Sequence, residues 1–145
     1  MRNSRADAVW EGNLAQGQGK VSTASGVLQT APISWAARTE GPQTMTSPEE
    51  LLAAAHAGCY SMALSNTLNS RGTPPTRLNT SAVVTFDQAD GGWKVTTSRL
   101  SVRGVVPGID QAAFADAANA AAQGCPVSKA LAGVQVILDS ATLES

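Results

Sequence analysis

The chain has 145 residues and a net charge of −1, with 10 Lys and Arg side chains against 11 Asp and Glu side chains. This length suits one domain with a sizeable core. The balanced charge gives no reason to expect nucleic acid or an anionic membrane as a partner. No apolar run follows the charged N-terminus and no segment is long enough to span a membrane, so we expect a cytoplasmic protein.

The first third of the sequence predicts short strands separated by turns. Short apolar segments bounded by glycine or proline lie near residues 8–11, 20–23, 27–29 and 33–38. This pattern is typical of an antiparallel meander. We therefore expect Arg38 at the end of an apolar strand, followed by a loop at residues 40–43.

Residues 47–70 predict one long helix. Ser47 can cap it, Pro48 suits its first position, and Glu50 completes a capping box. No Asp, Glu, Lys or Arg follows Glu50 until Arg71. A helix without a charged face is expected to be buried nearly all round.

The rest of the chain predicts a hairpin, two helices and a last strand. Strands at 78–87 and 93–106 flank the turn Asp90-Gly91-Gly92. Asp110 can cap a helix at 111–123, Pro126 begins a short helix, and residues 133–142 alternate as a strand. This order predicts an α+β fold, a single domain over residues 1–145 with an antiparallel sheet around the long helix.

The two cysteines, Cys59 and Cys125, are the first candidates for chemistry. They are too few and too far apart for a disulfide framework or a zinc site, and we expect no metal or cofactor. A free cysteine such as Cys59 is often only a small core residue. Cys125 lies between a helix-ending glycine and a helix-starting proline, where we expect a thiol near the surface and near amides that favour a thiolate. The pair fits a nucleophile with a resolving partner, and two incidental cysteines remain the alternative.

A thiol in the middle of a helix, such as Cys59, needs a nearby cation to ionise at neutral pH. Arg38 is the best-placed candidate, and Glu49 or Glu50 could orient its guanidinium; ordinary solvated charges are the alternative. Glu49 and Cys59 are ten positions apart, about 15 Å along a helix. If both serve one site, the carboxylate must come from a second copy of the helix.

His56 is the only histidine and lies three residues before Cys59. It could act as a base, but a buried histidine packed at the helix interface is the commoner outcome. We assign it no catalytic role.

Several stretches together resemble the OsmC branch of the OsmC/Ohr peroxidases, and the resemblance covers nearly the whole chain. They are Trp10-Glu11-Gly12, residues 19–28, Ser47-Pro48-Glu49-Glu50-Leu51-Leu52, Ala54-Ala55-His56-Ala57-Gly58-Cys59, Pro107-Gly108-Ile109-Asp110 and Gly124-Cys125-Pro126-Val127-Ser128. The resemblance implies an intertwined homodimer with the two long helices buried between sheets. It also implies thiol-dependent reduction of hydroperoxides, with electrons from dithiols such as lipoyl groups.

The resemblance also implies roles for four residues. Cys59 corresponds to the thiol that reacts with peroxide and Cys125 to the resolving thiol. Glu49 corresponds to the acid ten residues before the reactive cysteine, and Arg38 to the arginine of the OsmC branch.

We therefore expect a stress-response peroxidase that reduces organic hydroperoxides, and hydrogen peroxide less well, through a Cys59 sulfenate and a Cys59–Cys125 disulfide. The apolar flank near Leu52, Tyr60 and Met62 would suit a hydrophobic peroxide tail. The alternative is a ligand-binding or structural dimer with inert cysteines. A thiol–disulfide oxidoreductase acting on proteins is disfavoured because no Cys-x-x-Cys motif is present.

Overall fold

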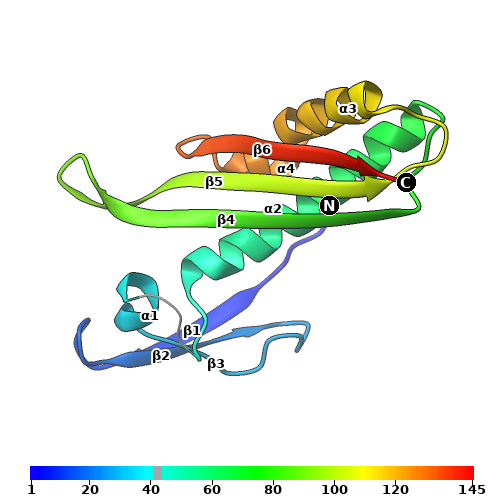
Figure 1. Ribbon diagram of the computed structural model, residues 1–145. Helices are drawn as coiled ribbons and strands as arrows, with labels where there is room; N and C mark the ends of the chain where they lie inside the picture. The colour runs from blue at the N-terminus through cyan, green and yellow to red at the C-terminus, as the bar shows by residue number, and fades with distance from the viewer. Residues whose placement is uncertain (41–43) are drawn as a thin grey trace. The chain divides into compact units, whose positions relative to one another are not determined.

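The computed structural model describes residues 1–40 and 44–145 and divides into two compact units, residues 1–51 and 52–145 (Figure 1). In chain order the elements are β1 (Ala6–Glu11), β2 (Gln18–Thr23), β3 (Ala31–Ile33), α1 (Trp35–Thr39), α2 (Pro48–Ser70), β4 (Arg77–Ala89), β5 (Gly92–Val105), α3 (Gln111–Gly124), α4 (Pro126–Ala130) and β6 (Gln135–Glu144).

The first unit contains a three-stranded antiparallel sheet in the order β1-β2-β3. Ala6 pairs with Thr23 across β1 and β2, and Gly19 pairs with Ile33 across β2 and β3. The predicted antiparallel meander is confirmed, but residues 27–29 lie in the bend that joins β2 to β3 instead of the expected strand, and the third strand lies at Ala31–Ile33.

The segment at 33–38 is only partly a strand, so this part of the prediction was wrong. Strand β3 ends at Ile33, and the next residues form the helix α1. Ser34 causes the change, because its side chain accepts a hydrogen bond from the Ala37 amide at 3.1 Å and caps the helix. Arg38 therefore lies in the last turn of a short helix. Residues 41–43 of the predicted loop lie outside the described residues.

Helix α2 begins with the predicted cap. The Glu50 amide donates to Ser47 Oγ at 3.1 Å. The Glu50 carboxylate accepts from the Thr46 hydroxyl at 2.8 Å. The helix runs unbroken to Ser70. No helix among the described residues has the length and apolar character needed to cross a membrane.

The second unit contains a mixed sheet in the order β4-β5-β6. Asp90 (φ 53°) and Gly91 (φ 84°) form the turn that joins antiparallel β4 and β5, as predicted. Strand β6 pairs with β5 in parallel, which corrects the prediction of an antiparallel sheet. The reason is the crossover through α3 and α4, which returns the chain to the starting end of β5 before β6 begins.

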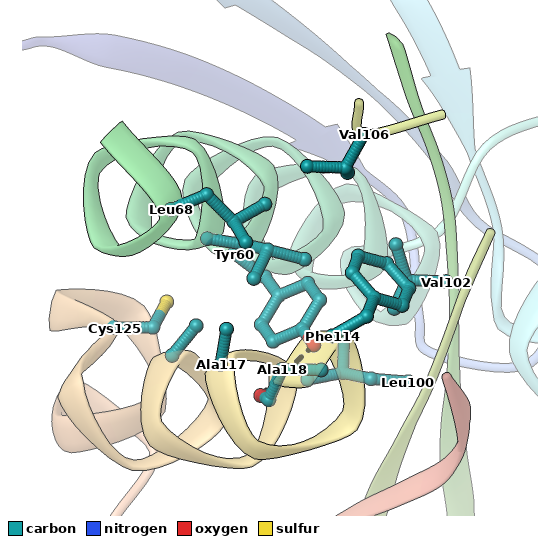
Figure 2. Packing of buried hydrophobic residues seen from close by; sticks show 11 residues of the cluster. Tyr60, Leu68, Leu100, Val102, Val106, Phe114, Ala117, Ala118 and Cys125 are labelled. Carbon is teal, nitrogen blue, oxygen red and sulfur yellow. Dashed lines mark hydrogen bonds between the residues drawn. The ribbon is translucent and has the colours of Figure 1, made fainter. Parts of the chain in front are cut away.

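One face of this sheet carries the core (Figure 2). Helix α2 contributes Tyr60, Leu64 and Leu68, four residues apart along one stripe. The remaining buried members of the cluster are Leu100 and Val102 of β5, Val106 after it, Phe114, Ala117, Ala118 and Ala121 of α3, and Cys125. The alanines let α3 approach closely, and the Tyr60 hydroxyl donates to the Ala118 carbonyl at 3.0 Å.

The opposite stripe of α2 is exposed within the chain. It consists of Ala54, Gly58, Met62 and Asn66, also four residues apart. Met62 is 70% exposed, and a Cβ added at Gly58 would meet nothing within 4 Å. The single chain therefore buries one face of this helix, and its burial nearly all round stays a prediction.

Candidate active site

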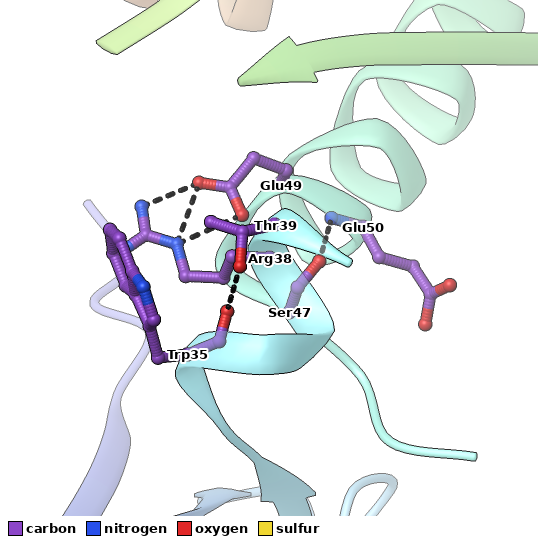
Figure 3. Close-up of polar contacts among 6 residues, drawn as sticks. All are labelled: Trp35, Arg38, Thr39, Ser47, Glu49 and Glu50. Carbon is purple, nitrogen blue, oxygen red and sulfur yellow. Dashed lines mark hydrogen bonds and ion pairs between the residues drawn. The ribbon is translucent and has the colours of Figure 1, made fainter. Parts of the chain in front are cut away.

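The first group of candidate residues is the pair of Arg38 and Glu49, which lies in the first unit (Figure 3). Arg38 Nη2 is 2.6 Å from Glu49 Oε1, and Arg38 Nε is 3.2 Å from both carboxylate oxygens. The Arg38 guanidinium also lies over the Trp35 ring, 5.6 Å from its centroid. Several charge-assisted contacts together hold a guanidinium in one orientation.

The local sequence explains why this pair forms. Arg38 occupies the last turn of α1, and Glu49 occupies the first turn of α2, where the helix dipole favours a negative charge. Glu49 is only 6% exposed, so its carboxylate would be costly to bury without a positively charged partner. Of the two acids considered from the sequence, Glu49 is the one that binds Arg38.

A small cavity of about 270 Å³ lies beside Arg38 in the same unit. Its lining is mostly apolar and consists of Trp10, Leu14, Ile33, Ser34, Trp35, Arg38 and Pro48. From the sequence, the apolar tail of the peroxide substrate was expected instead near Leu52, Tyr60 and Met62. Tyr60 is fully buried in the core and is not available for that purpose.

The second group is the pair of thiols, which lies in the second unit. Cys59 and Cys125 are both free, and the Cys59 side chain makes a hydrogen bond to Cys125. Cys59 is half-buried, whereas Cys125 is fully buried. The expectation that Cys125 lies near the surface was wrong, because the turn into α4 directs its side chain toward α2 and α3 (Figure 2).

The two thiols have opposite pKa shifts. Burial raises the pKa of Cys59, and a hydrogen bond from the Val127 amide only partly opposes this rise. Burial also acts to raise the pKa of Cys125, but hydrogen bonds from the Ser128 amide, the Cys59 thiol, the Ser128 hydroxyl and the Val127 amide bring it below its ordinary value. Within the second unit these hydrogen bonds therefore favour a thiolate at Cys125 over one at Cys59.

His56 lies beside this pair and makes two hydrogen bonds. Its Nδ1 is 2.6 Å from Ser98 Oγ, and its Nε2 is 2.8 Å from Ser128 Oγ. Burial lowers the pKa of His56, so the imidazole is neutral at neutral pH. Sequence reasoning expected a packed histidine and missed both serines as its partners. The spacing of Cys125 and Ser128, three residues apart at a helix start, was the available signal for one of them.

A metal site would need a cluster of ligands. Among residues 1–40 and 44–145 the structure contains no group of three or more His, Cys, Asp and Glu side chains that could hold an ion. Two reduced thiols joined by a hydrogen bond can instead form a disulfide. Fold and site together define an α+β protein with a paired-thiol centre.

Comparisons with known proteins identify the family. The model of the OsmC-like protein family matches residues 41–139. The chain is 44% identical over 129 residues to peroxiredoxin OsmC of Escherichia coli K12, covering 89% of this chain and 90% of that protein. It is 31% identical over 116 residues to the organic hydroperoxide resistance protein OhrB of Bacillus subtilis, covering 79% and 82%. The chain belongs to the OsmC-like family.

Solved structures agree with this assignment. The crystal structure of Bacillus subtilis OhrB superposes with a TM-score of 0.73 at 28% identity, covering 97% of this chain and 98% of that one. An organic hydroperoxide resistance protein from Elizabethkingia anophelis, 23% identical, gives 0.74 with 97% and 96% coverage and supports the fold alone. The α+β class predicted from the sequence is confirmed.

Proposed function

We propose that this protein is a cysteine-based peroxidase that reduces organic hydroperoxides, and hydrogen peroxide less efficiently. The observation that carries the proposal is the hydrogen-bonded contact between Cys59 and Cys125. Membership of a family whose relatives are named for peroxide reduction and hydroperoxide resistance supports the same role in detoxification.

The proposed reaction uses Cys59 as the nucleophile, because it is the more exposed sulfur of the pair. Its thiolate attacks the distal, hydroxyl-bearing oxygen of the peroxide, so an S–O bond forms and the O–O bond breaks. The leaving alkoxide takes up a proton and departs as an alcohol, or as water from hydrogen peroxide. Cys59 becomes a sulfenic acid and the peroxide has gained two electrons.

Cys125 then resolves the sulfenic acid. Its sulfur attacks the Cys59 sulfur, the S–O bond breaks, and the hydroxide takes up the Cys125 proton to leave as water. An external dithiol such as a lipoyl group reduces the resulting Cys59–Cys125 disulfide and is itself oxidised to a disulfide. No other cofactor is needed. A cytoplasmic location belongs to the proposal, because a reducing compartment supplies such dithiols.

Arg38 is proposed to change which thiol is ionised, so that Cys59 and not Cys125 is the thiolate. In the second unit the hydrogen bonds favour a Cys125 thiolate, and burial disfavours one at Cys59. A guanidinium beside Cys59 would reverse this order, and the Cys59 proton would pass to Cys125 along their hydrogen bond. It would also stabilise the charge on the leaving oxygen, while Glu49 holds it in place.

The preference for organic hydroperoxides rests on the cavity beside Arg38. Trp10, Leu14, Ile33 and Trp35 supply apolar walls that suit a hydrocarbon tail. Arg38, which also lines the cavity, can donate hydrogen bonds to the peroxide group.

The site is proposed to be shared in a homodimer. Glu49 and Cys59 lie on the same unbroken helix, about 15 Å apart along its axis. The exposed stripe of α2, with Gly58 and Met62, is the kind of small and apolar surface on which a second copy of the helix can pack. We also propose that both units form one OsmC-like domain over residues 1–145, because the OhrB structure matches 97% of the chain.

A peroxide-consumption assay with a dithiol reductant tests this function. Hydrogen peroxide and a bulky organic hydroperoxide are compared side by side, and we expect turnover with both and the higher kcat/KM with the organic substrate. A ligand-binding or structural dimer with inert cysteines, the second candidate, predicts no consumption and no loss of free thiols. That result would contradict the proposal.

A further inference from the structure

A continuous chain of hydrogen bonds runs from Ser98 to the buried sulfur of Cys125. Ser98 Oγ is 2.6 Å from His56 Nδ1, and His56 Nε2 is 2.8 Å from Ser128 Oγ. The Ser128 hydroxyl is in turn hydrogen-bonded to the Cys125 sulfur. Ser98 and His56 are both fully buried. Buried polar groups of this kind are costly unless every one is satisfied.

The donors and acceptors in this chain fix one another. A hydroxyl has a single proton, so a hydroxyl that donates it to a sulfur can only accept in its other hydrogen bond. If Ser128 donates to Cys125, His56 Nε2 must carry the proton and donate to Ser128 Oγ. His56 Nδ1 then accepts from the Ser98 hydroxyl. If Ser128 instead donated to His56, donor and acceptor would exchange roles in each of these hydrogen bonds.

We propose that His56 is a positioning residue whose Nε2–H holds the Ser128 hydroxyl as a donor to Cys125, which makes Cys125 the favoured leaving thiolate when its disulfide with Cys59 is reduced. The role of Cys125 as a leaving thiolate rests on the proposed peroxidase function. The hydrogen bonds from Ser98 to Cys125 do not depend on that function. Both ring nitrogens of His56 are engaged by Ser98 and Ser128, so His56 acts on Cys125 through Ser128.

The step that benefits is the attack of the external dithiol. Its thiolate attacks the Cys59 sulfur, a new S–S bond forms, and the Cys59–Cys125 bond breaks. The electron pair of that bond goes to Cys125, whose thiolate accepts the Ser128 hydrogen bond. A thiol with a lower pKa leaves faster, so these hydrogen bonds direct the attack to the accessible sulfur of Cys59.

The other titratable groups beside Cys125 do not replace this donor. They are Cys59, whose thiol donates to Cys125 in the reduced protein but has no proton to donate in the disulfide, and Tyr60. Burial, followed by the charge of Cys125, raises the pKa of Tyr60, and its hydroxyl already donates to the Ala118 carbonyl.

The first test is the titration of Cys125, followed by the ultraviolet absorbance of its thiolate in a Cys59→Ser background. Ser128→Ala should raise the Cys125 pKa by about one to two units, as expected for loss of a hydrogen bond to a charged group. Ser128→Thr, which keeps the hydroxyl, should leave it nearly unchanged. His56→Gln can still donate to Ser128 and should resemble the parent, whereas the shorter His56→Asn should resemble Ser128→Ala. Equal Cys125 pKa values in the Ala and Thr variants, or in the Gln and Asn variants, would overturn the proposal.

A second measurement needs no substitution. His56 is the only histidine, so nitrogen NMR of the reduced protein reports its tautomer without overlap. We expect the proton on Nε2, and a proton on Nδ1 would overturn the proposal. Neither measurement uses peroxide, so a protein that fails to consume hydroperoxide would refute the peroxidase and leave these two results as an independent test.

Discussion

Replacing Cys59 by serine should abolish peroxide reduction, lowering kcat/KM by roughly a thousandfold or more, as loss of a covalent nucleophile does in other enzymes. A serine hydroxyl stays protonated at neutral pH and is a poor nucleophile without a strong base. The steady-state peroxide-consumption assay with a dithiol measures the effect. The change removes little volume from a half-buried position, so we expect the fold to be kept.

A matched control is Cys59→Ala, which also removes the thiol and should be equally inactive. Circular dichroism and thermal unfolding of both variants would show that the loss is chemical. Substantial turnover in either folded variant would mean that Cys59 is not the sulfur that meets the peroxide.

Dimers that combine one Cys59→Ser subunit with one Arg38→Met subunit should recover peroxidase activity, although each variant is defective by itself. Cys59→Ser removes the nucleophile, and Arg38→Met removes the cation proposed to activate it. If Arg38 of one subunit serves Cys59 of the other, each mixed dimer has one intact site and one doubly damaged site. Its activity should then reach about half that of the unmodified dimer, since a twofold dimer has two equivalent sites.

Co-expression with two different affinity tags, followed by sequential purification, isolates the mixed dimers for assay. Pairing Cys59→Ser with Cys59→Ala is the control, because every site then lacks its thiol and no activity should return. If all residues of a site came from one chain, every site in the test pair would keep one lesion. Activity of verified mixed dimers no higher than the mean of the two parents would therefore contradict the shared site.

Local features of this fold could be predicted from the sequence. The cap at Ser47, the turn at Asp90 and the cap at Asp110 depend on residues within a few positions of one another. The pairing of Arg38 with Glu49 was also predictable, because both lie close to the start of the long helix. Motifs at short range determine these features.

Features that depend on long-range packing were missed. The burial of Cys125 results from contacts with α2 and α3, and the parallel pairing of β6 depends on where the crossover returns. The partners of His56 lie 42 and 72 positions away in the sequence, at Ser98 and Ser128. Hydroxyl groups are common on strands and at helix starts, so Ser98 did not stand out, and the spacing of Ser128 from Cys125 gave no indication that it would also contact the imidazole.

The central claim is that Cys59 and Cys125 act as one redox pair, with Cys59 reacting first. The most direct measurement is mass spectrometric mapping of the reduced protein, and of its Cys125→Ser variant, after one equivalent of an organic hydroperoxide. We expect a Cys59–Cys125 disulfide in the unmodified protein, and Cys59 as sulfenic or sulfinic acid in the variant, where no resolving thiol remains. An unoxidised Cys59 in the variant, or two free thiols in the unmodified protein after the hydroperoxide has been consumed, would contradict the claim.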